Sequence, residues 1–121
     1  MEGPAYSEKV LALFDDPPHL GPPSGVTHEG FAENPARGAW VRIYLRAGDG
    51  SVAEAGFHAR GCPHTIAAAA CAVSGLHGRN LADLADFSGE YLPGTLGLPA
   101  EKLDIRILVE DAIRAAARGR R

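Results

Sequence analysis

The chain has 121 residues, of which 45% are hydrophobic and 22% are charged. This length and balance are typical of one folded domain, here expected over residues 1–121, and they exclude a disordered tail or a fibre. The formal net charge is -3. A chain with this charge lacks the overall positive field that neutralises phosphates, so we expect no nucleic-acid partner.

Neither a membrane anchor nor a secretory signal is expected. The longest apolar run, over 66–73, is far shorter than the roughly 20 residues that cross a bilayer. The first residues lack the basic and apolar segments of a signal peptide. Two cysteines are too few for a disulfide framework. We therefore expect a cytoplasmic protein with no membrane partner.

The first half of the chain predicts one short helix followed by strands. Tyr6, Val10 and Phe14 recur on one face of a helix that a pair of prolines then stops. The proline- and glycine-rich stretch that follows is expected to be mostly loop, with a short strand over 26–31. Residues 40–46 alternate as a half-buried strand, and a glycine-rich turn predicts a hairpin with a second strand over 52–60.

Helical spacing replaces the alternation after residue 61. Pro63 suits a first helical position, which places Cys62 at the N-cap, and the apolar spacing continues as far as His77. A short helix capped by Asn80 and a turn-rich connection over 89–99 are expected next.

The last expected element is a long amphipathic helix over about 102–118. Leu108 and Ala112 lie on its apolar side, whereas Glu110 and Asp111 lie on its polar side. The basic residues that follow are expected to fray or to favour the helix C-terminus.

Cys62 is the most informative candidate for chemistry. A thiol at a helix N-terminus sees the positive end of the helix dipole and free N–H groups, which favour the thiolate. His64 lies in the same first turn and is a candidate second ligand or proton acceptor; the alternative is that Cys62 is only a small capping residue. Cys71 falls on the opposite face of the helix, where we expect a core residue that does not bridge to Cys62. The other histidines are scattered, as surface or cap residues would be: His19, His28, His58 and His77.

Several short motifs are spread along nearly the whole chain. In order they are Tyr6-Ser7-Glu8-Lys9-Val10, Asn34-Pro35-Ala36 followed by Gly38, a hairpin ending in Phe57, Gly61-Cys62, Gly78-Arg79-Asn80-Leu81, Leu98-Pro99 followed by Lys102, and Leu108-Val109-Glu110-Asp111-Ala112-Ile113. Together they resemble the IscU/NifU-type iron-sulfur cluster scaffold family, because an ordered set of motifs is more specific than any one of them.

The resemblance implies an α+β fold, a three-stranded antiparallel sheet with helices packed on one face, like the IscU/NifU N-terminal domain. It also implies a protein that is not an enzyme in the strict sense. Members of the family accept sulfur from a cysteine desulfurase and iron from a donor, build a [2Fe-2S] cluster on three cysteines and pass it on. Some relatives hold zinc in the same pocket.

Most of the family's site residues are replaced in this chain. Arg37 stands at the position of the first ligand cysteine, and Ala39 replaces the aspartate two residues on. The second cysteine is kept as Cys62, whereas Asp104 and Ile105 stand where the family has a histidine and its third cysteine. Because a cluster normally needs four ligands, mostly thiolates, an incomplete or transient [2Fe-2S] site is implied, or none at all.

Arg37 changes the charge expected in this pocket. A guanidinium keeps its positive charge, so it repels iron or zinc and favours a thiolate or a carboxylate. We therefore expect an ion pair between Arg37 and Asp104 in the space that metal takes in relatives. The leading hypothesis is a divergent scaffold-like protein with an accessory or binding role in cluster or sulfur handling. In this hypothesis Cys62 receives a persulfide or provides a single ligand.

Two other functions remain open. One is a mononuclear zinc or iron site made by Cys62, Asp104 and His64, with His28 or water as a further ligand. The other is a protein-binding module with a silent pocket, which meets its partner through the solvent-facing strand residues Trp40, Arg42 and Tyr44.

The segment Leu98-Pro99-Ala100-Glu101-Lys102 is similar to the Leu-Pro-Pro-Val-Lys stretch by which many bacterial members engage an Hsp70-type chaperone. Glu101 stands where an apolar residue docks, which argues against that contact. A simple turn before a helix explains the same residues. The partner that the resemblance favours is therefore a cysteine desulfurase.

Overall fold

The computed structural model describes residues 6–121 and confirms the α+β fold. Three antiparallel strands form one sheet in the order β1-β2-β3. Gly30 of β1 pairs with Ile43 of β2, which pairs in turn with Phe57 of β3. The strands are β1 (His28–Asn34), β2 (Ala39–Gly48) and β3 (Ser51–Arg60).

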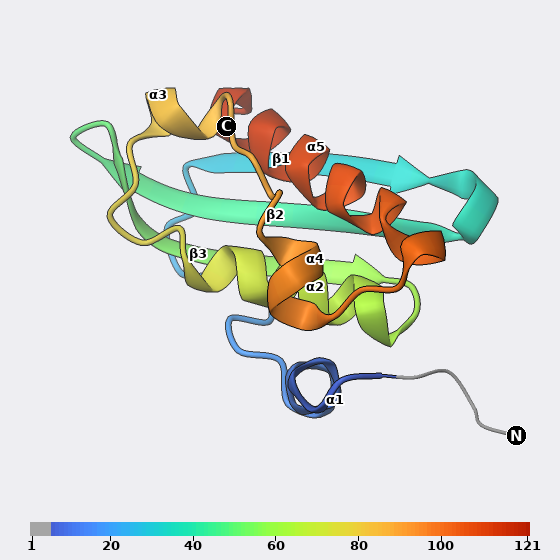
Figure 1. Cartoon of the computed structure of the whole chain (residues 1–121). Helices are drawn as coiled ribbons and strands as arrows, with labels where there is room; N and C mark the ends of the chain where they lie inside the picture. The colour runs from blue at the N-terminus through green and yellow to red at the C-terminus, as the bar shows by residue number, and fades with distance from the viewer. Residues whose placement is uncertain (1–5) are drawn as a thin grey trace, which may run out of the picture.

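Helices cover one face of the sheet. Figure 1 shows α5 running along β1 and α2 along β3 on the same side, with α1 outside α2. The alternate residues Val41, Ile43 and Leu45 of β2 are buried beneath these helices. The helical elements are α1 (Glu8–Asp15), α2 (Pro63–Ser74), α3 (Leu81–Leu84), α4 (Leu92–Leu96) and α5 (Asp104–Arg118), with short 3-10 turns η1 (Pro35–Arg37) and η2 (Ala100–Lys102). Within residues 6–121 no helix combines the length and the apolar character that a membrane crossing requires.

The first helix differs from its expected pattern. Ser7 caps α1, since its hydroxyl accepts a hydrogen bond from the N–H of Val10, and Val10 is fully buried. Phe14 was expected on the same face but is 44% exposed. The physical reason is that α1 packs mainly on α2, so its buried stripe is narrow and Leu13 packs against the core instead.

Element boundaries also shift at three places. The first strand begins at His28 rather than residue 26 and extends to Asn34, because all seven of its residues pair with β2. The helix after Cys62 ends at Ser74, so the expected helical residue His77 lies beyond it and is exposed. The turn-rich connection contains the short helix α4, which ends at Gly97 in the left-handed conformation (φ 66°).

The basic C-terminal residues are ordered against β1, contrary to the expectation that they fray. The N–H of Glu29 donates to the carbonyl of Gly119, and the N–H of Arg121 donates to the carbonyl of Thr27. The Arg121 guanidinium also pairs with the Glu29 carboxylate at 2.8 Å. The chain end therefore extends the outer edge of the sheet for a short distance.

Helix α5 approaches β1 unusually closely at Gly30. A Cβ atom on this glycine would overlap the backbone of Ala112 and Ala116. Both alanines are fully buried, so small residues on the helix and a glycine on the strand together permit the contact. This contact fixes the position of α5, and therefore of its N-terminus, relative to the sheet.

We predict that Gly30→Ala destabilises the protein by about 1–3 kcal/mol or more, because the added methyl group meets backbone that cannot move without shifting the helix. Urea unfolding checks this. Gly48→Ala is the matched control, since a Cβ at Gly48 meets no atom within 4 Å. Equal stability of the two variants would contradict the close contact.

Glu110 is buried, although the sequence places it on the polar side of the last helix. Only 6% of the residue is exposed. Its carboxylate accepts hydrogen bonds from the N–H of Gly89 at 2.7 Å and from Arg106 at 2.8 Å, and Arg114 lies 3.9 Å away. Burial alone would raise the pKa of Glu110, but these hydrogen bonds and charges outweigh it and lower the pKa. Glu110 therefore ties the turn before α4 to α5.

We predict that Glu110→Gln lowers the free energy of unfolding by about 1–2 kcal/mol at neutral pH, because it removes a charged hydrogen-bond acceptor. The pKa of Glu110 is lowered on folding, so its contribution is present above the ordinary value of 4.5 and is lost as the pH falls through the folded pKa. The difference between variant and wild type should shrink below about pH 4.5, as denaturant unfolding at a series of pH values can measure. Asp111→Asn, which makes the matching change at the exposed neighbouring carboxylate, is the control.

Candidate functional site

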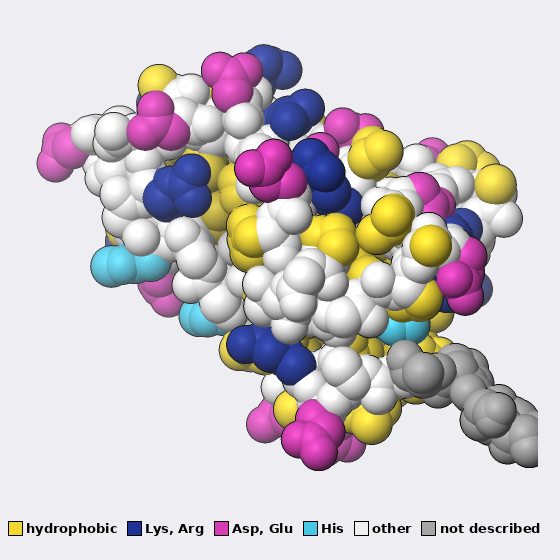
Figure 2. Space-filling model, viewed as in Figure 1, with side chains coloured by type: hydrophobic (Ala, Val, Ile, Leu, Met, Phe, Trp, Pro, Cys, Tyr) yellow, Lys and Arg dark blue, Asp and Glu magenta, His cyan; other side chains and the backbone are white. Residues whose placement is uncertain are grey.

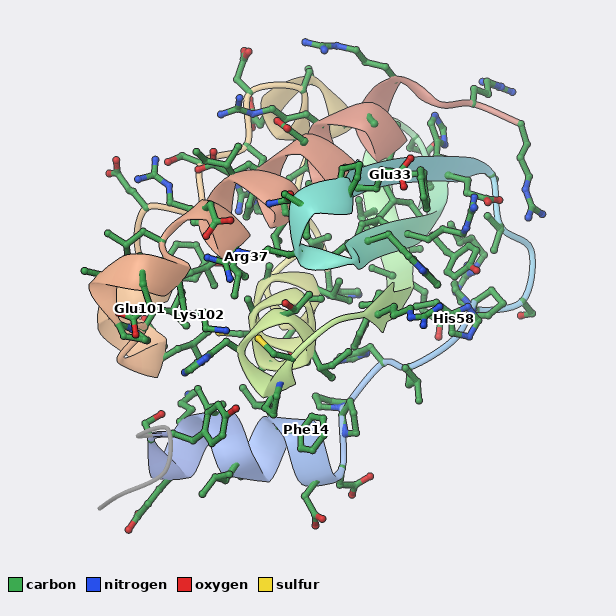
Figure 3. The ribbon with its side chains drawn as sticks, turned by 90° about the vertical axis from the view of Figure 1, so that its right-hand side faces the viewer. Phe14, Glu33, Arg37, His58, Glu101 and Lys102 are labelled. Carbon is green, nitrogen blue, oxygen red and sulfur yellow. The ribbon has the colours of Figure 1, made fainter. Side chains whose placement is uncertain are left out.

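The candidate site forms where three chain segments meet at one end of the sheet. These are η1 between β1 and β2, the N-terminus of α2, and η2 with the start of α5. Figure 3 shows Arg37, from η1, on the side of the molecule where Glu101 and Lys102 lie. Arg37 and Cys62 are 25 residues apart in the sequence, and Cys62 and Lys102 are 40 residues apart. Only the sheet register and the packing of the two helices therefore bring the three segments together.

The expected ion pair between Arg37 and Asp104 is present and is bidentate. The Arg37 Nε and Nη2 atoms donate to the two carboxylate oxygens at 2.5 Å and 2.6 Å. Arg37 Nη2 also donates to the carbonyl of Glu101, and Asn34 donates to Asp104 at 3.0 Å. The hydrogen bond from Arg37 is the main reason why the pKa of Asp104 is lowered. Both charges of the pair are therefore already satisfied by protein groups.

Cys62 is the N-cap of α2, as the sequence predicts. Its half-buried Sγ lies 3.5 Å from the ammonium group of Lys102 and 3.7 Å from the hydroxyl of Thr65. Burial would raise the pKa of the thiol, but hydrogen bonds from the Thr65 and His64 segment, together with the Lys102 charge, lower it. The thiolate is thus favoured at this position, and its nearest charged neighbour is a cation.

His64 follows Cys62 but is not directed to a polar partner. Only 1% of the residue is exposed, and neither ring nitrogen has a hydrogen-bond partner among the described residues. Its ring packs against the Tyr6 ring with centroids 4.7 Å apart. Burial is the first cause, and the Lys102 charge the second, that lower the pKa of His64. The imidazole is therefore held in its neutral form.

Two further positions of the site are filled by apolar residues. Ala39 is buried at the start of β2, and Ile105 is 1% exposed in the first turn of α5. Ile105 belongs to the hydrophobic core, so it closes the space between the helix and the sheet.

The structure does not assemble the metal-ligand set of Cys62, Asp104 and His64. No group of three or more His, Cys, Asp or Glu side chains in residues 6–121 is arranged to hold a metal ion. The thiol and the carboxylate face different cations. His28 lies far from these residues because it is at the other end of the sheet. It pairs with Leu45 near the end of β2, whereas Cys62 follows Arg60, which pairs with Trp40 at the start of β2.

His28 and Tyr44 were expected to be exposed and are buried. His28 is hydrogen-bonded to Thr27 at the start of β1. Tyr44 is 8% exposed, and its hydroxyl contacts His58 at 2.8 Å. Its pairing partner Gly56 lies directly beneath the backbone of Gly21, so the loop after α1 covers this part of the sheet.

The rest of that sheet face is partly open. Trp40 and Arg42 are half-buried, and the exposed Phe31 packs against both. Of the three residues predicted to meet a partner, Trp40 and Arg42 are therefore partly accessible, whereas Tyr44 is buried.

The chaperone-like segment is partly used within the protein. Leu98 is buried, Pro99 precedes η2, and the amine of Lys102 turns to Cys62. The neighbouring Leu103 and Ile107 are 44% and 56% exposed. Figure 2 shows apolar side chains gathered among scattered charges on the face that carries α4 and α5.

Sequence reasoning found Arg37, Asp104 and Cys62 but not the role of Lys102 at the thiol. In the sequence Lys102 belongs only to a motif, two residues before the start of α5. Its contact with Cys62 can be predicted only when the N-termini of α2 and α5 are known to be adjacent.

We predict that Lys102→Met shifts the pH profile of Cys62 alkylation to higher pH, because the ammonium charge that favours the thiolate is removed. Iodoacetamide rates in a Cys71→Ser background measure this, since Cys62 is then the only thiol. Lys9→Met, the matched removal of the other lysine, should leave the Cys62 profile in place. An unchanged profile in Lys102→Met would show that the contact has no electrostatic effect.

Known proteins share both the sequence and the fold of this chain. The family model for the NifU-like N terminal domain matches residues 5–119. The iron-sulfur cluster assembly scaffold protein IscU of Azotobacter vinelandii is 31% identical, over 94% of this chain and 92% of that protein. IscU of Escherichia coli K12 is 29% identical, over 93% and 91%.

Solved structures agree in fold. The N-terminal part of a NifU-like protein from Brucella abortus superposes with a TM-score of 0.71 at 15% identity, covering 93% of this chain and 91% of that one. FiSufU from Fervidobacterium islandicum AW-1 gives a TM-score of 0.73 at 13% identity, over 93% and 96%. From the family match and the relatives together, the chain belongs to the NifU-like N-terminal domain family of the IscU/NifU type.

Proposed function

We propose that this protein serves iron-sulfur cluster assembly as an accessory that handles sulfur on Cys62 and does not hold a cluster by itself. Membership of the family supports the process. The observation that carries the proposal is the contact of the Cys62 thiol with the Lys102 ammonium at 3.5 Å. This contact favours a nucleophilic thiolate and places a cation, rather than a further ligand, beside it.

The residues at the site do not fit a [2Fe-2S] cluster. Such a cluster is normally held by four ligands, most of them thiolates, and Cys62 is the thiol of this site. Asp104 is neutralised by two hydrogen bonds from Arg37, and a guanidinium does not lose its proton to admit a metal ion. Ile105 lies in the core where the family resemblance implies a third cysteine. The same contacts disfavour a mononuclear zinc or iron site.

The sulfur step that we propose is a transfer between two cysteines. The Cys62 thiolate attacks the outer sulfur of a persulfide carried by a cysteine desulfurase, and a new S–S bond forms at Cys62. The S–S bond of the desulfurase breaks and its cysteine leaves as a thiolate. The proton stays on the transferred sulfur, so no oxidant or reductant is consumed. The Lys102 ammonium stabilises the negative sulfur before the transfer and the persulfide after it.

A cysteine desulfurase in the cytoplasm is the partner that this role requires. The exposed Leu103 and Ile107 lie beside Asp104, and they line a surface hollow of about 610 Å³ together with Pro93. Leu103 directly follows Lys102, whose ammonium contacts the thiol. An exposed apolar surface on this segment suits a partner that must bring its own cysteine close. The role is not enzymatic, because the protein is an acceptor and is not regenerated in the step itself.

The proposal predicts that a desulfurase supplied with cysteine loads one sulfur on Cys62, as intact-protein mass spectrometry measures. Cys62→Ser should abolish the loading, and Lys102→Met should slow it, because the thiolate fraction falls. Cys71→Ser is the matched control and should load normally, since burial raises the pKa of the Cys71 thiol.

Iron and acid-labile sulfide, measured after anaerobic reconstitution, distinguish the alternatives. We expect neither in stoichiometric amount in the wild type. The combined variant Arg37→Cys, Asp104→His and Ile105→Cys restores the ligand types that the family resemblance implies and serves as the positive control. A cluster in the wild type that Cys62→Ser abolishes would establish a working scaffold instead. Absence of both sulfur and cluster would leave a module that only binds proteins.

A further inference from the structure

The outer edge of β1 is free over part of its length. β1 pairs with β2 on one side only. On the other side the end of the chain occupies the first part of the edge. There the N–H of Glu29 donates to the carbonyl of Gly119. The N–H of Arg121 donates to the carbonyl of Thr27. Within residues 6–121 no segment pairs with the edge beyond Glu29.

The strand register shows which backbone groups this free part presents. The N–H of Glu29 points away from β2, because it donates to Gly119. Backbone groups alternate in direction along a strand, and β1 pairs with β2 without a register shift from His28 to Asn34. The N–H and C=O groups of Phe31 and Glu33 therefore also point outward. Such groups on an edge strand are a template for a further strand.

A hollow of about 200 Å³ follows the same edge, between the end of β1 and α5. Figure 3 shows Glu33 on this outer strand, next to α5. One wall of the hollow is made by Glu33, Asn34 and Pro35, and the other by Ile107, Leu108 and Asp111 of α5. A strand added to the edge would therefore lie beside side chains of α5 as well as beside β1.

The hollow is acidic. Glu33 and Asp111 are exposed and take part in no ion pair within residues 6–121. Asp104 also lines the hollow, but it is paired with Arg37. No lysine or arginine is among the lining residues. Two carboxylates without cationic partners along an open strand edge favour a positively charged strand.

The open face of the sheet adds an apolar contact at the same place. Phe31 is 41% exposed and packs against Trp40 and Arg42, which lie on the face away from the helices. Because side chains alternate between the two faces of a strand, an added strand would meet Phe31 on one face and the acidic hollow on the other. A segment that alternates basic and apolar residues matches both.

The end of this chain shows the type of segment that fits the edge. It is basic, and its Arg121 guanidinium lies 2.8 Å from the Glu29 carboxylate. Glu33 lies four residues further along the same face of β1 and has no such cation. A second copy of the chain fits less well. An antiparallel pairing centred on Phe31 would set Glu33 opposite Glu29 of the second copy, and like charges in that position destabilise a sheet.

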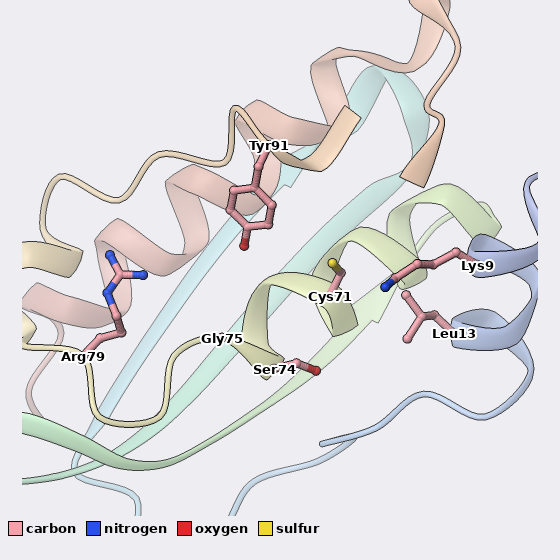
Figure 4. Close-up of a pocket in the computed structure, with 7 residues that line it drawn as sticks. All are labelled: Lys9, Leu13, Cys71, Ser74, Gly75, Arg79 and Tyr91. Carbon is pink, nitrogen blue, oxygen red and sulfur yellow. The ribbon is translucent and has the colours of Figure 1, made fainter. Parts of the chain in front are cut away.

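A basic segment has no comparable place at the hollow beside α1. That hollow has a volume of about 480 Å³, and its charged lining residues are Lys9 and Arg79. Figure 4 shows these two side chains at opposite ends of it. Both ends repel a cation, so this hollow does not compete with the edge of β1.

We propose that the free edge of β1, at Phe31 and Glu33, binds an extended basic segment of a partner protein as an added strand. Main-chain hydrogen bonds join the segment to β1. Its basic side chains contact Glu33 and Asp111, and its apolar side chains contact Phe31. The proposal requires neither Cys62 nor a desulfurase, so its failure is distinguishable from failure of the proposed sulfur transfer.

A short peptide in which valine and lysine alternate, with both ends blocked, is the probe. We expect the peptide to bind the full chain saturably, as fluorescence anisotropy measures. Two N-methylated forms, one methylated at the valines and one at the lysines, have the same charge. One of them should bind at least about tenfold more weakly, because it lacks the N–H groups that face β1. This comparison uses the wild-type protein, so it does not depend on the folding of a variant.

Substitution of the two free carboxylates tests the charge of the edge. Glu33→Gln combined with Asp111→Asn should weaken binding of the peptide by about three- to tenfold, as loss of two opposite-charge pairs across strands does. Asp83→Asn combined with Asp86→Asn is the matched control. It makes the same change in net charge at two exposed carboxylates elsewhere, and it should leave the affinity in place.

Hydrogen exchange locates the bound peptide. In the free protein the N–H groups of Phe31 and Glu33 should exchange faster than those of Gly30 and Ala32, and the peptide should slow them. Three results would overturn the proposal: no saturable binding at millimolar concentration, equal binding of the plain and both N-methylated peptides, or protection at other residues only. A mass of two chains in light scattering, with Phe31 and Glu33 protected in the absence of peptide, would also overturn it, because a second copy would then occupy the edge.

Discussion

The close contact between α5 and β1 at Gly30 is the constraint on which the rest of the structure depends. Because a Cβ atom at this position would overlap the helix backbone, α5 lies at its observed distance from the sheet only with glycine at position 30. That distance brings Asp104, at the first turn of α5, to Arg37 in the turn between β1 and β2. It also brings Glu110, two turns later, to the backbone of Gly89. The close approach of α5 to β1 thus contributes to both the candidate site and the anchor of α4.

In the candidate site the anionic groups are paired with protein cations. Each anionic group faces its own cation, Asp104 with Arg37 and the Cys62 thiol with Lys102. A site of metal ligands has the opposite arrangement, in which several anionic or neutral donors converge and the ion supplies the positive charge. The proposed function follows from this arrangement: because protein side chains already supply the positive charge, we expect an added cation to bind weakly. In that proposal Cys62 is the group that handles sulfur.

The two cysteines of α2 differ because of their surroundings and not because of the helix that they share. Cys62 lies at the N-terminus, where backbone N–H groups and Lys102 lower its pKa. Cys71 lies about two and a half turns later, where burial outweighs the effect of Lys9 and raises its pKa. The thiolate is therefore more favoured at Cys62 than at Cys71, although both lie on α2.

The sequence by itself determined the order of the strands and helices, the N-cap position of Cys62 and the pairing of Arg37 with Asp104. The order of the elements and the N-cap follow from local periodicity and capping signals. The pairing of Arg37 with Asp104 follows from the family resemblance, which places both residues in one pocket. It did not determine the burial of Glu110, Tyr44 and His28, nor the exposure of Phe14. The pattern along a single helix or strand predicts that a polar residue faces solvent. Glu110 and Tyr44 are buried because distant segments, at Gly89 and at Gly21, pack over them. The contact between Lys102 and Cys62, 40 residues apart, was decided by tertiary structure alone, because it depends on two helix N-termini that no local pattern relates.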